Sequence, residues 1–380
     1  MTATRTATPR LRRRTVWILA SGLLAVAACS GSRADGSAST EGGTTTPPTT
    51  ERAATTSEAT TTTKATTTTK ATTTTTTPRR PVEPARMPLT GKPLARGQRP
   101  PNRPALVVKI DNVDAKPQAG LNQADIVFEE VVEGRATRFA AVFHSQGSNP
   151  VGPIRSGRTQ DVDLLTGLNH PLFAWSGGNP GVTAAIQNSE FVPLTHGSAD
   201  GFYRSGDRGA PHNLYNTTDA LWAQATPEAG RPRPLFRYVL PRERVKGATA
   251  SSLDVQVGHN HVRWEWSPEC KCYLRFENGS AHHATDAQVT TDNVVVLETG
   301  YRPSYVDSRS PEAVTVGEGK AYVMSDGRIQ FGRWQRKVNT DPVRLFVGRQ
   351  GHRLMEIAPG RTWVELADVA DANVSWELSR

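Results

Sequence analysis

The threonine-rich segment before residue 88 most strongly limits what this chain can fold into. Residues 30–87 contain almost no apolar side chain larger than alanine, and between Thr44 and Thr77, 21 of 34 residues are threonine. Such a segment buries too little apolar area to offset the entropy lost on ordering it. We therefore expect residues 30–87 to form a disordered stalk. Its composition suits both an O-glycosylated stalk and a bare flexible linker.

The first 29 residues have the three-part plan of an export signal. Arginines precede an apolar run from Val16 to Val26, and small residues follow before Cys29. The run is too short to span a hydrocarbon core about 30 Å thick, so we expect this signal peptide to be removed. Ala27-Ala28-Cys29 matches the lipobox, at which a diacylglyceryl group joins the thiol. Cys29 is therefore the predicted lipidation site, carrying acyl chains such as palmitate.

Lipidation also predicts a location. Two or three acyl chains hold a protein firmly, so we expect the body on the outer face of the cytoplasmic membrane, with membrane lipid as a partner. An ordinary signal peptide with an unrelated cysteine is the alternative, and Arg13-Arg14 leaves both Sec and twin-arginine export open. The five arginines of residues 1–29 leave with the signal, which lowers the net charge from +9 to +4. We expect no nucleic-acid partner, because that function requires a concentrated basic face.

The body after Met87 has about 290 residues, enough for two modest domains with cores of their own. Its first half mixes strand and helix patterns, whereas its second half is almost purely strand and turn. We predict an α+β protein in which a mixed α/β N-terminal domain (residues 88–240) is followed by an all-β C-terminal domain (residues 247–380).

In the first half, the apolar run at residues 105–110 predicts a strand buried on both faces. Residues 126–132 and 137–144 predict a hairpin. Three short helices are expected: Thr159 to Thr166, capped by Thr159 and ended by Gly167; Pro180 to Gln187 after Asn179; and Thr217 to Gln224, capped by Asn216. In the second half, Asp326-Gly327 predicts a tight hairpin, and further strands are expected at residues 262–266, 273–276, 293–297 and 362–366.

Several long strings follow one another along the body. In the first half they are PLTGKP, VVKIDN, GLNQADIVFEEVVEG with TRFAAVFHS, GPIRSGR and APHNLY, and in the second half TDNVVVLET, GKAYVMSDGRIQFGRW and PGRTWVEL. Together they resemble the YerB-like lipoproteins of Gram-positive bacteria, from about Pro88 to Leu366. The resemblance implies a lipoprotein body with an N-terminal and a C-terminal domain. Because the function of this family is unknown, the resemblance implies no catalytic residue.

Polar residues gather in the first half where core packing gives no reason for them, at strand ends and before helices. The candidate ligand-binding residues are Asp111, Glu133, Arg138, Arg155, Ser156, Arg158, His212 and Asn213. Arginines beside a helix N-terminus make a good receptor for phosphate, sulfate or carboxylate. The alternative is that Arg155 and Arg158 simply pair with nearby carboxylates.

His212 lies in a loop ahead of a helix, where it could carry a proton near neutral pH, although a solvent-facing or backbone-bonded histidine is more common. If the candidates converge, carboxylates, cations and an imidazole would share one pocket, a mixture that suits hydrolysis or transfer at a glycosidic or phosphoester bond. Spacing alone does not establish convergence, so the catalytic residues, and enzyme activity itself, stay open.

Cys270 and Cys272 are two residues apart near a hairpin end, where a small disulfide is expected in an oxidising compartment. A zinc site formed with His259 and His261 is the alternative. The tryptophans at 264, 266, 334 and 363 suit a core, and an aromatic carbohydrate platform is the second interpretation.

These observations predict a lipid-anchored cell-envelope protein that binds, and in a stricter version processes, an anionic or glycan ligand through its N-terminal domain. A cell-wall polymer is the expected partner because an anchored protein outside the membrane can reach it. The alternative function is a non-catalytic scaffold or regulatory partner of another envelope protein. No cofactor and no metal are expected.

Overall fold

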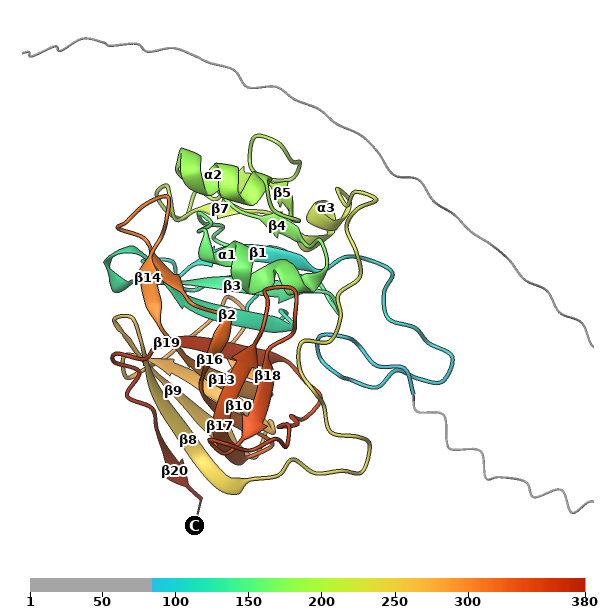
Figure 1. Cartoon of the computed structure of the whole chain (residues 1–380). Helices are drawn as coiled ribbons and strands as arrows, with labels where there is room; N and C mark the ends of the chain where they lie inside the picture. Colours follow the sequence, from blue (N-terminus) through green and yellow to red (C-terminus); the bar gives the residue numbers. More distant parts are fainter. Residues whose placement is uncertain (1–83, 380) are drawn as a thin grey trace, which may run out of the picture. The chain divides into compact units, whose positions relative to one another are not determined.

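Strands dominate the part of the chain that the computed structural model describes, residues 84–379 (Figure 1). The predicted signal peptide, Cys29 and residues 30–83 of the predicted stalk lie outside these residues, so the structure does not test them. Within residues 84–379 the three α-helices contain only six, eight and five residues. The α+β prediction is therefore confirmed only in part: the body is mostly β, with its short helices in the first half. Among the described residues, no helix has the length and apolar composition needed to cross a membrane.

The first half is built on three central strands, and its predicted hairpin is confirmed. β2 pairs antiparallel with β3, and β3 with β1, while β1, β4 and β5 run parallel. The run that begins at Leu106 is buried on both faces, as its apolar residues predict. The strands are β1 (Leu106–Asp111), β2 (Ile126–Val131), β3 (Thr137–Phe143), β4 (Leu172–Ala174), β5 (Val192–Leu194), β6 (Tyr203–Arg204) and β7 (Leu214–Tyr215).

All three predicted helices are present, but three of the residues predicted to cap or end them were wrong. The helices are α1 (Gln160–Leu165), α2 (Pro180–Gln187) and α3 (Thr218–Trp222), with 3-10 turns η1 (Glu133–Arg135) and η2 (Thr166–Leu168). Helix α2 begins after Asn179 as predicted, and Asn179 caps it by accepting the Val182 N–H at 2.9 Å. Thr159 makes no side-chain cap, and Gly167 does not end the helical turn, which continues as η2. Thr217 rather than Asn216 caps α3.

The second half consists of strands, and the Asp326-Gly327 hairpin is confirmed, joining β16 to β17. The strands are β8 (Ala248–Val257), β9 (Asn260–Ser267), β10 (Cys272–Glu277), β11 (Ser280–Ala281), β12 (Thr290–Thr291), β13 (Asn293–Thr299), β14 (Tyr301–Pro303), β15 (Pro311–Ala313), β16 (Gly317–Ser325), β17 (Arg328–Arg336), β18 (Arg344–Val347), β19 (Thr362–Asp368) and β20 (Ser375–Leu378).

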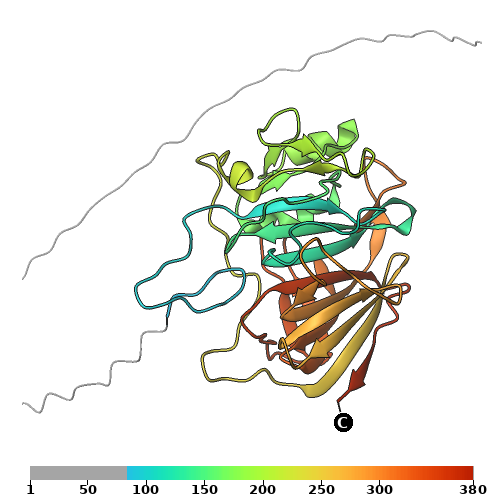
Figure 2. The same cartoon turned by 180° about the vertical axis from the view of Figure 1, so that it is seen from behind.

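One late strand joins the two halves into a continuous sheet. β19 lies between β13 and β2 and runs parallel to both, so that Thr362 is opposite Asn293 on one side and Ile126 on the other. The sheet order thus passes from β16 and β13 through β19 to β2, β3 and β1 (Figures 1 and 2). Apolar clusters cover both faces of this sheet. The division into domains at residues 88–240 and 247–380 stays a prediction, because this sheet runs through both.

Candidate functional site

The loop that contains the arginines is held against the end of β1 by backbone hydrogen bonds. The Asp111 N–H donates to Pro153 O at 3.0 Å, and the Arg155 N–H donates to Lys109 O at 2.8 Å. On the opposite side, the Ile154 N–H donates to Leu214 O in β7 at 2.6 Å. The loop therefore continues the sheet for a few residues and places Arg155 beside the end of β1.

Asp111 is the centre of one group of polar side chains. Its side chain is buried, and Oδ2 accepts hydrogen bonds from Arg155 Nε at 2.9 Å and from His212 Nδ1 at 2.7 Å. Arg155 and His212 remain about a quarter exposed, at 22% and 24% of their side chains. The carboxylate thus holds one cation and one imidazole at the surface, with Nδ1 of the ring bound and the ring orientation fixed.

Glu133 is the centre of a second group. Arg158 binds it with two donors on one edge of its guanidinium: Nε donates to Oε1 at 2.7 Å, and Nη2 donates to Oε2. Ser310 also donates to Oε1. Burial alone would raise the pKa of Glu133, but the hydrogen bonds from Arg158 and Ser310 outweigh it and lower that pKa to about 2. Glu133 is therefore ionised at every physiological pH, and it neutralises Arg158 locally.

Arg138 differs from the other two arginines because no carboxylate within residues 84–379 pairs with it. It lies opposite Asp111 in the β1–β3 ladder and is 93% buried, since its exposed fraction is 7%. Its guanidinium donates once, from Nη1 to Ser156 O at 3.1 Å, and its buried Nε has no acceptor in the described part of the chain. Burial, reinforced by repulsion from Arg158 and Arg155, lowers the pKa of Arg138 to about 10.

A polar cleft of about 680 Å³ lies next to this group, and Ser156, whose carbonyl oxygen accepts from Arg138, is one of its lining residues. Glu133, Ser156 and Arg158 line it together with residues that sequence reasoning missed: Ser176 to Asn179 before α2, and Asp307, Arg309 and Ser310 from the loop between β14 and β15. No pattern in the sequence pairs that late loop with the first half. Only the fold brings Ser310 to Glu133.

Seven of the eight predicted residues form one connected group around Arg138, which lies close enough to Asp111, Glu133, Arg155 and Arg158 for their charges to affect its pKa. Only Glu133, Ser156 and Arg158 of them line the cleft. Asn213 does not belong to this group, because its amide donates to Ser205 O and Arg208 O while its oxygen accepts from Arg204. Asn213 therefore shapes its own loop. The convergent group can neutralise an anion, and the imidazole of His212 beside it can exchange a proton.

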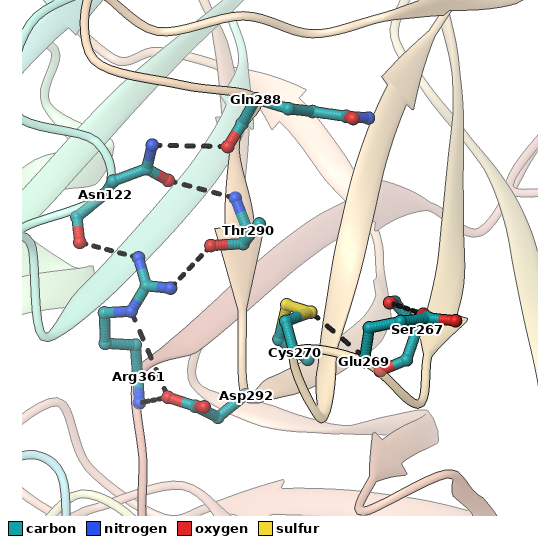
Figure 3. Close-up of a disulfide and its surroundings, with 9 residues drawn as sticks. Asn122, Ser267, Glu269, Cys270, Gln288, Thr290, Asp292 and Arg361 are labelled. Atoms are coloured by element: carbon teal, nitrogen blue, oxygen red, sulfur yellow. Dashed lines mark hydrogen bonds and ion pairs between the residues drawn. A yellow bond between two sulfur atoms is a disulfide. The ribbon is translucent and has the colours of Figure 1, made fainter.

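Contacts in the second half bear on the alternatives for the two cysteines and for the tryptophans. Cys270 and Cys272 form a disulfide with Cα atoms 5.2 Å apart, in the turn that carries Ser267 and Glu269 (Figure 3). These sulfurs are therefore not zinc ligands, and within residues 84–379 no group of three His, Cys, Asp or Glu side chains is arranged to hold a metal. Three of the four tryptophans considered as a carbohydrate platform, Trp264, Trp334 and Trp363, lie in the core.

Comparison with known proteins assigns this chain to a family. Residues 89–231 match the N-terminal domain, and residues 253–364 the C-terminal domain, of the family described as "Protein of unknown function (DUF3048)". The chain belongs to this family, which confirms the resemblance seen in its sequence.

One relative is "Putative lipoprotein YerB" of Bacillus subtilis (strain 168). The two sequences are 28% identical over 280 residues, covering 71% of this chain and 82% of YerB. The crystal structure of YerB matches with a TM-score of 0.65 at 25% identity, over 76% of this chain and 99% of that one.

Proposed function

We propose that this protein is a lipoprotein, anchored through Cys29 on the outer face of the cytoplasmic membrane, whose body binds an anionic group of a cell-wall polymer. The lipobox before Cys29 and the name of the YerB relative support the anchor. An anchored protein at that face reaches wall polymers that carry phosphate or carboxylate groups. The ligand group would bind at the edge of the cleft, between Arg138, Arg155 and Arg158.

The state of Arg138 carries the proposal. A buried cation costs free energy unless an anion or several acceptors compensate it, yet Arg138 has one neutral acceptor among the described residues. Arg155 and Arg158 already have carboxylate partners, so Arg138 is the arginine of the three whose charge is not paired within residues 84–379. A phosphate or carboxylate beside Arg138 would supply the missing acceptors, because a guanidinium group forms bidentate hydrogen bonds with either anion.

Titration calorimetry on the purified protein tests the proposal. The probes are inorganic phosphate, a glycerol-phosphate polymer, a uronic-acid oligosaccharide and a neutral oligosaccharide of similar length. Removing a hydrogen-bonding charge costs about 1.5–3 kcal/mol, so Arg138→Met should weaken binding of the charged probes by roughly 10- to 100-fold. Arg237→Met is the matched control, because Arg237 is 63% exposed and pairs with Glu356 away from the cleft.

Wild-type protein should bind at least one charged probe and ignore the neutral one, and Arg237→Met should bind as the wild type does. Equal affinity of wild type and Arg138→Met would overturn the proposal. Absence of binding to every charged probe would do the same, and would favour a scaffold that contacts another envelope protein.

A further inference from the structure

Three ionisable side chains meet in a place that water does not reach, directly beneath the arginine loop. Lys109 comes from β1, Glu130 from β2 and Asp161 from α1, and the three side chains have no exposed surface. Lys109 Nζ lies 2.9 Å from Asp161 Oδ1 and forms an ion pair with Glu130 as well. Val107 and Phe128, neighbours on the same strand faces, belong to an apolar cluster. The proposed anion site uses none of these three residues.

This arrangement is more than an ordinary ion pair needs. One amine serves two carboxylates, and Glu130 Oε2 has no partner among residues 84–379. Burial, followed by the neighbouring charge of Asp161, raises the pKa of Glu130 to about 8. Glu130 is therefore a carboxyl group that readily takes up a proton, and it lies next to an amine that can release one.

We propose that Lys109 and Asp161 condense to an amide bond between their side chains, an isopeptide bond, with Glu130 as the proton carrier. Glu130 first takes a proton from the Lys109 ammonium, which leaves a neutral amine. The nitrogen lone pair attacks Asp161 Cγ, so that the Nζ–Cγ bond forms. Glu130 passes its proton to an Asp161 oxygen and then transfers a second one from the nitrogen to the same oxygen. The Cγ–O bond breaks, one water leaves, and Glu130 is ionised again.

The surroundings of Asp161 favour this reaction. Its second oxygen, Oδ2, accepts the Arg158 N–H at 2.7 Å, so a backbone donor is already in place for the negative charge that develops during attack. The fold holds the amine in contact with the carboxyl group, so the reaction does not pay the entropy cost of bringing two separate molecules together. Exclusion of water prevents hydrolysis of the product. The bond would tie β1 to the start of α1 and so fix the arginine loop between them.

Peptide mass spectrometry of the full-length protein tests the proposal. The protein is denatured, reduced and digested with trypsin, which cuts after lysine and arginine but not after an acylated lysine. We expect no cut after Lys109, and a branched species in which the Lys109 peptide is joined to the peptide that begins at Thr159, lighter than the two together by one water. Cutting after Arg158 in the same digest shows that the unfolded chain is accessible. A free, unmodified peptide ending at Lys109 would overturn the proposal.

Two variants test the chemistry itself. Asp161→Asn should still form the bond, but by losing ammonia, so its joined species has the same mass as that of the wild type. Glu130→Gln cannot carry the protons and should lose most of the joined species, while circular dichroism reports whether it folds. If Glu130→Gln is folded and joined as fully as the wild type, Glu130 is not the proton carrier and the mechanism is wrong. If the link in the joined species of Asp161→Asn lies at a position other than 161, the bond has been assigned to the wrong residue.

Discussion

Replacing Arg138 with methionine should make the protein more stable while weakening its ligand binding. The lowering of the Arg138 pKa from 12.5 to about 10 corresponds to roughly 3 kcal/mol of unfavourable free energy for the charged form in the fold. Methionine keeps the apolar stem and removes the charge. It also removes the single hydrogen bond to Ser156 O, at a cost of about 1.5–3 kcal/mol. The balance favours the variant by about 1 kcal/mol.

Arg336 provides a matched control of opposite sign. It is equally buried, at 3% exposed, and burial lowers its pKa to about 10 as well. However, its guanidinium donates to three carbonyl oxygens, of Asp341 and Asp163 at 2.9 Å and of Asn339. Three such hydrogen bonds are worth more than the charge costs, so Arg336→Met should lower the free energy of unfolding by at least about 1 kcal/mol.

Urea unfolding in buffer free of phosphate measures both variants, with equal m-values as the sign that the unfolding reaction is unchanged. Adding an anionic ligand at about 100 times its Kd should stabilise the wild type by roughly 2.7 kcal/mol and Arg138→Met by much less. The reasoning is refuted if Arg138→Met is destabilised as strongly as Arg336→Met, because Arg138 would then be compensated within the fold and would not await a ligand.

Two further predictions concern the buried contacts between the two halves. Arg275→Met should lower the free energy of unfolding by about 3–5 kcal/mol, because Arg275 is fully buried between Glu129 and Glu277. Arg237→Met, at a pair in which both side chains are exposed, should cost under about 1 kcal/mol. Equal losses of the two variants in denaturant unfolding would contradict this prediction. Burial opposes ionisation of Glu277, but Arg275 and Lys116 outweigh it and lower its pKa to about 2. The stabilising contribution of Glu277 is therefore complete above about pH 4.5 and is lost as the pH falls toward 2. Over that range the urea midpoint should fall less steeply with pH in Glu277→Gln than in the wild type. If the midpoints of the two proteins fall in parallel, the low pKa does not belong to Glu277.

Local sequence patterns determined most of the elements. The apolar run at β1, the β2–β3 hairpin, the Asn179 cap and the Asp326-Gly327 turn depend on side chains within a few residues of one another, and all are present. Thr159 failed as a cap because its backbone is already helical, which side-chain identity alone does not reveal. The lipobox is a local pattern as well, and the lipidation of Cys29 that it indicates stays a prediction.

Tertiary structure decided how these elements meet. Nothing local to residues 362–368 indicates that β19 inserts beside β2, although Thr362 pairs with Ile126, 236 positions earlier, because strand order is set by packing of the whole sheet. The same packing brings Ser310 to Glu133 and Lys109 to Asp161. The sequence identified the polar residues of the site, since buried strand ends rarely need arginine, but only the fold showed that Arg155 and Arg158 have carboxylate partners and that Arg138 does not. Charge pairing depends on distance through space, which residue order does not encode.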